Sequence, residues 1–142
     1  MAMHTWFECK IRYEKTIESG MQKKVTEPYL VDALSFTEAE ARIIEEMTPF
    51  ITGEFTVSDI KRANYSELFF CEDDSADRWF KCKLIFITLD EKSGAEKKTA
   101  TQVLVQAADL RDAVKKLDEG MKGTMADYQI GMVAETPLMD VF

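Results

Sequence analysis

The sequence has little of what most catalytic and metal-binding sites require. Its 142 residues include one histidine, His4, together with three cysteines and six scattered glycines. A single histidine argues against a Ser-His-Asp triad, a Cys-His pair and a histidine-rich metal site. The glycines form no phosphate-binding loop. We therefore predict that the protein is not an enzyme, and we expect no catalytic residues, no cofactor and no metal ion.

Long apolar runs and paired cysteines are absent as well. No apolar stretch approaches the roughly 18 residues of a membrane helix. The first four residues lack the basic and apolar regions of a secretory signal. An odd number of cysteines without paired spacing favours free thiols and a reducing compartment. We expect a cytoplasmic protein that does not contact a membrane, with Cys9 and Cys82 as buried thiols.

The formal net charge of −8 is unevenly distributed along the chain. The segments 6–24 and 78–98 together carry 11 basic and 6 acidic residues, whereas the remainder carries 7 basic and 20 acidic residues. The overall balance argues against generic binding of polyanions. Segregated charge can nevertheless act locally, and it marks these two segments as candidate contact regions.

The chain repeats itself at an offset of 73 to 74 residues. WFECK at 6–10 returns as WFKCK at 79–83, and SGMQKK at 19–24 returns as SGAEKK at 93–98. Twelve positions between 6 and 43 are identical in the second copy. Self-similarity of this kind is the signature of a repeated structural unit. We predict a tandem duplication of a unit of about 65 residues.

Each copy has the pattern of a β-β-α-β unit. Phe7, Cys9 and Ile11 alternate with polar residues, as in a strand with one buried face. A turn containing Gly20 or Gly94 leads into a second strand, at 25–33 or 99–107. A capping box predicts a helix after Ser35, and Asp109 is the corresponding cap in the second copy. Third strands are predicted at 54–60, continuing towards residue 69, and at 127–133, continuing towards residue 142.

These elements predict an α+β fold with a mainly antiparallel sheet and one helix per repeat on one face. Short connections and a right-handed crossover favour the strand order 3-1-2. The repeats are expected at 4–70 and 78–142, joined by an acidic connector at 71–77. We predict a single compact domain with a continuous core and a pseudo-twofold arrangement. The repeats could form one six-stranded sheet or two packed sheets.

The segments WFECKIRYEK, KKVTEPYLVDALSFTEAEARI and KKTATQVLVQAADLRDAVKKLDEGMKGTMADY resemble an uncharacterised bacterial family of domains of unknown function. This resemblance covers essentially the whole chain and implies no activity. Each half is also weakly similar to the β-β-α-β module of the ribosomal L18a/L20a proteins. The shared features are an aromatic-led first strand with lysine and a strand running into an alanine-rich acidic helix.

The outer face of the predicted sheet and the two hairpins carry the candidate binding residues. Aromatic rings beside cations on a sheet can hold single-stranded nucleic acid by stacking and phosphate contact. The same tryptophans could instead pack at a seam between repeats or between subunits. The candidates are Trp6, Lys10, Arg12, Lys23, Lys24, Trp79, Lys81, Lys83, Lys97 and Lys98.

Two functions follow from these candidates. The first is a non-catalytic interaction protein that presents an aromatic sheet surface to a protein partner or to a second copy in a homodimer. The alternative is a protein that binds single-stranded nucleic acid or another anionic ligand through its basic hairpins. The two differ in one observable, because only the alternative requires binding that weakens with salt.

Overall fold

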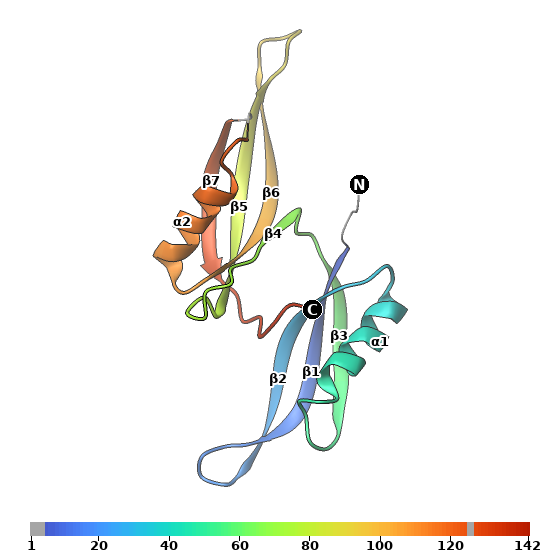
Figure 1. The fold of residues 1–142 in the computed structure, drawn as a ribbon. Helices are drawn as coiled ribbons and strands as arrows, with labels where there is room; N and C mark the ends of the chain where they lie inside the picture. Colours follow the sequence, from blue (N-terminus) through green and yellow to red (C-terminus); the bar gives the residue numbers. More distant parts are fainter. Residues whose placement is uncertain (1–4, 125–126) are drawn as a thin grey trace. The chain divides into compact units, whose positions relative to one another are not determined.

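The protein folds into two compact units (Figure 1). The structure is a computed structural model that describes residues 5–124 and 127–142, so His4 lies outside the described residues. Unit 1 comprises the chain up to Asn64 together with Pro137–Phe142, and unit 2 comprises Tyr65–Thr136. The predicted α+β class is confirmed, since each unit combines a mostly antiparallel sheet with one helix.

Unit 1 contains three antiparallel strands in the predicted order. They are β1 (Trp6–Thr16), β2 (Gln22–Asp32) and β3 (Phe55–Ala63), arranged β2-β1-β3. The β1–β2 hairpin turns at Gly20, whose φ of 84° favours glycine. A register shift between Lys10 and Ile11 interrupts the pairing of β1 with β3, and such irregularities bend and twist a sheet locally.

Helix α1 (Phe36–Met47) begins at the capping box that the sequence predicts. The Ser35 hydroxyl accepts a hydrogen bond from the Glu38 amide at 3.1 Å. A capping box predicts that the Glu38 carboxylate accepts from the Ser35 amide, whereas here it accepts from the amide of Leu34 at 2.9 Å. Both bonds satisfy backbone donors at the start of the helix and fix where it begins.

The core of unit 1 lies between α1 and one face of the sheet. Phe7, Cys9 and Ile11 of β1 point into it, as their alternation predicted. The helix contributes Ala39, Ile43 and Met47, and β2 contributes Tyr29 and Val31. Phe36 is half exposed but lies edge-on against Phe7, with ring centroids 4.9 Å apart.

Unit 2 has the same arrangement with a fourth strand. Its sheet has the order β4-β6-β5-β7, formed by β4 (Glu67–Phe69), β5 (Arg78–Leu89), β6 (Glu96–Ala107) and β7 (Asp127–Glu135). Helix α2 (Leu110–Gly120) is capped by Asp109, which accepts from the Asp112 amide at 2.8 Å. Phe80, Cys82 and Leu84 face this helix in a second buried cluster, with Ala113 and Leu117 opposite them.

Each sheet is extended by a segment that follows the last antiparallel strand of the other unit. After β3 the chain enters unit 2, where β4 pairs in parallel with β6, placing Leu68 opposite Leu104. After β7 the chain returns to unit 1, where Val141 forms a parallel bridge with Leu30 of β2. We call Pro137–Phe142 the return segment.

The predicted third strands therefore end too late. β3 stops at Ala63 and β7 at Glu135, and the apolar residues after each of them pair in parallel with β6 and β2. Alternation of apolar residues identifies a strand but not the sheet that it joins. Pro137, which has no backbone N–H, follows β7 closely and interrupts ladder pairing there.

The division into units also differs from the predicted boundaries at 70 and 78. The chain changes units at 64/65 and again at 136/137, and the predicted connector 71–77 lies within unit 2. There the amide of Cys71 donates to Gln106 Oε1 at 2.9 Å, and Ala76 is buried. The buried residues gather in two clusters, one in each unit, where the sequence had suggested one continuous core.

Candidate functional site

The sheet face of unit 1 opposite α1 carries most of the first copy's candidate residues. Side chains alternate along β1, so Trp6, Lys10 and Arg12 lie on the face that points away from the helix-side core. Exposure increases along this open face. Trp6 is only 8% exposed, Lys10 is half-buried and Arg12 is exposed. The accessible part is therefore the hairpin end of the sheet.

A concavity of about 860 Å³ lies at this hairpin end. Its lining combines cations, carboxylates, hydroxyls and two aromatic residues. We call it the hairpin concavity. It is lined by Arg12, Tyr13, Glu14, Gln22, Lys24, Thr26, Thr52, Gly53, Glu54, Phe55 and Thr56.

Strand register explains how these residues come together. Arg12 in the central strand is paired with Thr26 of β2 on one side and Thr56 of β3 on the other. Glu14 is paired with Lys24. Residues paired across a sheet lie on the same face, so all five share the open face. The loop between α1 and β3 closes one end, and Gly53 permits its turn with a φ of 103°.

The charges of the hairpin concavity balance. Arg12 and Lys24 supply two positive charges, and Glu14 and Glu54 supply two negative ones. A groove that follows a nucleic-acid backbone is instead lined predominantly by cations. The concavity is thus matched to a ligand that carries both signs of charge.

A polar cluster next to the hairpin concavity fixes the orientation of Tyr13. The Tyr13 hydroxyl donates to Glu27 Oε1 at 2.7 Å, and the Tyr29 hydroxyl donates to the same oxygen at 3.4 Å. Burial, together with this carboxylate, raises the pKa of Tyr13 to about 12. The same two causes raise the pKa of Tyr29. Both phenols therefore remain protonated donors at neutral pH, which holds Glu27 as their shared acceptor.

The corresponding surface of unit 2 has a different character. In β5 the open face continues from Lys83 to Ile85 and Ile87, where β1 has Arg12 and Glu14 at the equivalent positions. Ile85 is paired with Ala100 and Gln129. The two units therefore share a framework but differ in the chemistry of their hairpin ends.

The structure separates the predicted site residues into three groups. The indole side chains are buried, with Trp6 8% and Trp79 3% exposed, and Trp79 lies edge-on against Phe70 at 5.5 Å between ring centroids. Neither indole is accessible for stacking against a base in this structure. Lys10 and Lys81 are half-buried. The remaining candidates, Arg12, Lys23, Lys24, Lys83, Lys97 and Lys98, are exposed.

Of these candidates, only Arg12 and Lys24 line the hairpin concavity. Sequence reasoning did not identify Tyr13, Thr26, Phe55 and Thr56 as their neighbours. A signal for Thr26 was present, because the hairpin register follows from the turn at Gly20. The contribution of β3 had no such signal, since the register shift between Lys10 and Ile11 changes its alignment with β1.

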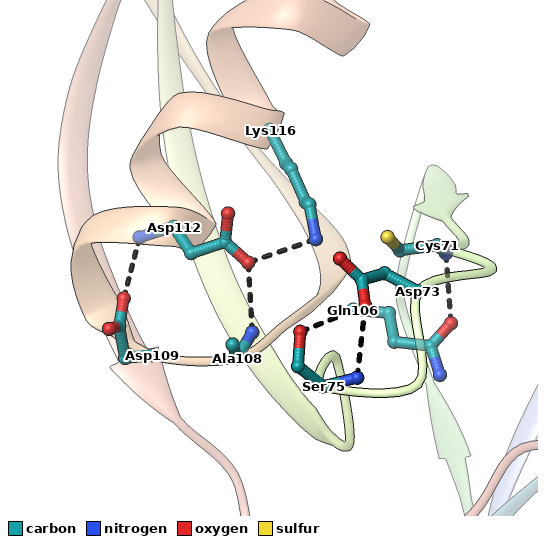
Figure 2. A network of polar contacts seen from close by, with 8 residues as sticks. All are labelled: Cys71, Asp73, Ser75, Gln106, Ala108, Asp109, Asp112 and Lys116. Atoms are coloured by element: carbon teal, nitrogen blue, oxygen red, sulfur yellow. Dashed lines mark hydrogen bonds and ion pairs between the residues drawn. The ribbon is translucent and has the colours of Figure 1, made fainter.

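Unit 2 contains a second polar site that the sequence did not reveal (Figure 2). Lys116 of α2 reaches towards the loop at 71–75 and pairs with Asp112 at 2.9 Å. Hydrogen bonding to Cys71 and to Asp112 raises the pKa of Lys116. Cys71 and Lys116 line a pocket of about 400 Å³ with Phe69, Phe70 and Gln106.

The bonds around this second site are mainly those of a helix cap. Asp112 also accepts from the amide of Ala108 at 2.9 Å, and this bond, followed by the one with Lys116, lowers the pKa of its carboxyl group. The side chain of Asp73 accepts from the amide and the hydroxyl of Ser75, which lowers the pKa of Asp73. These bonds order the start of α2 and the 71–77 loop separately, and the bond from Cys71 to Gln106 joins the loop to β6, as Figure 2 shows.

Within residues 5–124 and 127–142, no group of three or more His, Cys, Asp or Glu side chains is placed to hold a metal ion. The helices in these ranges are too short or too polar to cross a membrane.

The fold and these sites define an α+β protein of two sheet-and-helix units. A family model matches residues 5–142, and the chain belongs to that family, which is described as Domain of unknown function (DUF4494). A search of curated proteins and a search of solved structures gave no match.

Proposed function

We propose that the protein is a non-catalytic interaction protein that binds a protein partner or a second copy of itself. The observation that carries this proposal is the hairpin concavity, whose lining combines Arg12 of the open face with Tyr13 and Phe55, two aromatic residues paired with each other on the helix side of the sheet. Aromatic residues and arginine are the side chains most enriched in protein interfaces and their hot spots. The sequence had predicted Trp6 and Trp79 as the aromatic contact residues; because both are buried, we assign this role to Tyr13 and Phe55.

The balanced charges favour a polypeptide as the ligand. A protein segment can place an acidic side chain on Arg12 or Lys24 and a basic one on Glu54. A phosphate backbone would satisfy the two cations and be repelled by the two carboxylates. The mixed lining therefore supports a protein partner over a polyanion.

The proposal can be tested by site-specific photo-crosslinking in the native cell. A benzophenone amino acid replaces Thr26 in the full-length chain, and the matched control carries it at Ala100, its counterpart in β6. We expect a discrete adduct from position 26, with one protein species or the chain itself identified by mass spectrometry. The adduct should be lost when Arg12→Glu is added. The same adducts from both positions, or none from position 26, would contradict the proposal.

A second candidate function, binding of single-stranded nucleic acid or another anionic ligand, is supported by the exposed cations. Arg12 and Lys24 line the hairpin concavity, and Lys23, Lys97 and Lys98 are exposed on the hairpins. Binding to a fluorescent single-stranded RNA or DNA should weaken with rising salt. It should also weaken when Lys23, Lys24, Lys97 and Lys98 are changed to glutamate. Absence of binding at low salt would remove this candidate.

We also propose that the two units arose by tandem duplication, and this is supported by two lines of argument. Twelve positions in 6–43 are identical in the second copy. The two sheets share the orders β2-β1-β3 and β6-β5-β7, with the register shift at Lys10/Ile11 repeated at Lys83/Leu84. The pseudo-twofold arrangement, the single compact domain, the bacterial origin, the likeness to ribosomal L18a/L20a modules and the cytoplasmic location remain predictions.

A further inference from the structure

The edge of β2 binds an extended peptide as an added strand in this structure. The return segment lies along this edge and forms four backbone hydrogen bonds with it. The Met139 amide donates to Pro28 O at 2.9 Å, the Leu30 amide to Asp140 O at 3.0 Å, the Phe142 amide to Leu30 O at 2.8 Å and the Asp32 amide to Phe142 O at 3.2 Å. Main-chain bonds of this kind are how an exposed sheet edge recognises a peptide.

Side chains add selectivity to this edge. Phe142 packs against the helix-side core of unit 1 and stacks on Tyr29, with ring centroids 5.8 Å apart. Val141 lies opposite Leu30 in a parallel bridge, while Asp140 remains exposed. The bound segment therefore presents an acidic residue to solvent, an aliphatic residue opposite leucine and a phenylalanine to the core.

Unit 2 repeats this recognition with a second segment. Glu67, Leu68 and Phe69 form β4, with Leu68 opposite Leu104 and Phe69 packed against the core of unit 2. Both added strands thus read acidic, aliphatic, phenylalanine, and both lie parallel to the strand that precedes the helix. The same pattern therefore lies along the corresponding edge of both units.

In both instances the added strand follows the last antiparallel strand of the other unit. The return segment and β2 are separated by more than 100 residues of sequence, so no local turn joins them. The segment thus reaches β2 as a ligand tethered through a long chain, at an effective concentration of the order of millimolar. The return segment of a second molecule can therefore compete for the same edge when its concentration approaches this effective concentration.

We propose that the β2 edge is a docking site for an extended acidic–aliphatic–phenylalanine segment, and that its partner is the return segment of a second copy of this chain. The surface differs from the hairpin concavity and the proposal does not depend on it. Each copy donates its return segment to β2 of the other, so the exchange is reciprocal and yields a dimer. The dimer forms the same four backbone hydrogen bonds between the return segment and β2 as the monomer does, but between two chains.

The test uses a fluorescent peptide of residues 136–142 and full-length chains. The variant Met139→Pro removes one amide that bonds to β2, and the matched control Met139→Ala keeps it; the Met139 side chain itself is half exposed. Weakening the chain's own segment frees the edge, so the peptide should bind Met139→Pro about fivefold more tightly than Met139→Ala. A peptide with Phe142→Ala should not bind, and a peptide of residues 64–70 should compete.

Sedimentation velocity of the unmodified chain tests the partner. We expect dimers at chain concentrations approaching the order of millimolar, dissociated by excess 136–142 peptide but not by its Phe142→Ala form. A peptide that binds neither variant, or both equally, would overturn the docking site. A chain that binds the peptide yet stays monomeric throughout would overturn the second copy as its partner. Circular dichroism of both Met139 variants establishes that they fold.

Discussion

Phe142 stacks on Tyr29, with the planes of the two rings only 18° apart. This contact joins two residues separated by more than 100 positions and lies where the return segment meets β2. Tyr29 also donates through its hydroxyl to Glu27, which accepts from Tyr13 as well. The return segment is therefore connected through Tyr29 to the side chains beside the hairpin concavity.

Replacing Phe142 should destabilise unit 1. Phe142→Ala removes a partly buried ring and its stacking on Tyr29, and we expect a loss of about 2 kcal/mol in the free energy of unfolding. Phe142→Leu keeps most of the volume and should lose about half as much. Every chain in this experiment also carries Trp79→Phe, so that Trp6 is the one remaining tryptophan of the protein. Its fluorescence in urea titrations then reports on unit 1. Equal stability of the Phe142→Ala and parent chains would contradict the packing described.

Stability should fall at high pH because of Tyr13 and Tyr29, which share the Glu27 carboxylate. Tyrosine in an unfolded chain titrates near pH 10, whereas burial and Glu27 raise the pKa of Tyr13 to about 12 in the fold. Between these values the folded state holds a proton that the unfolded state has released. The stabilisation is therefore complete below pH 10 and is lost as pH rises towards 12.

The control for this effect is Tyr13→Phe, since phenylalanine occupies the equivalent position, Phe86, in unit 2. Urea titrations at a series of pH values from 8 upward, all in buffers of equal ionic strength, should show a shallower decline for this variant than for the unmodified chain. Parallel curves would mean that Tyr13 does not titrate with a raised pKa.

The three cysteines should differ sharply in reactivity. Cys9 and Cys82 are fully buried, and burial is the main cause that raises their pKa values to about 12 and about 11. The thiolate is the reactive form, so both should resist alkylation. Cys71 is partly exposed beside Lys116. Iodoacetamide followed by peptide mass mapping should label Cys71 alone in the native protein and all three in urea. Native labelling of Cys9 or Cys82 would contradict their burial.

Local pattern was sufficient to predict the two helices and the presence of three antiparallel strands in each unit. Alternation placed Phe7, Cys9 and Ile11 in the core, and the capping residues Ser35 and Asp109 located both helices. These features depend on neighbours in sequence, where periodicity and hydrogen-bonding rules apply directly. Short connections and a right-handed crossover gave the order of the three antiparallel strands in each unit.

The added strands could not be predicted in the same way. Leu68 and Phe69 have the pattern of a strand, and so do Val141 and Phe142, but nothing local specifies a partner more than 30 residues away. The burial of Trp6 and Trp79 was also beyond the pattern, since alternation assigns them to the outer face without saying what covers it. For this reason the sequence predicted a site at the two indoles, whereas the candidate site of the structure lies at the hairpin end of β1.

Gly120 should be intolerant of a side chain, although it does not have a positive φ. A Cβ added at this last residue of α2 would lie 2.8 Å from Cε1 of Phe69, the phenylalanine of β4. The ring is partly buried against the core of unit 2, so making room for the methyl group displaces this packing, and Gly120→Ala should lower the free energy of unfolding by about 1–3 kcal/mol. Helix propensity alone would predict the opposite sign, because alanine is favoured over glycine within a helix.

The measurement uses Trp79 as the reporter of unit 2, in chains that carry Trp6→Phe. Glu119→Ala, at the exposed neighbouring position, is the matched control and should change stability by less than about 0.5 kcal/mol. Adding Phe69→Leu to Gly120→Ala should restore part of the lost free energy of unfolding, because the smaller side chain makes room for the methyl group. If Gly120→Ala proved stabilising, β4 would not be packed against α2 as described, and the recognition of phenylalanine in unit 2 would lose its support.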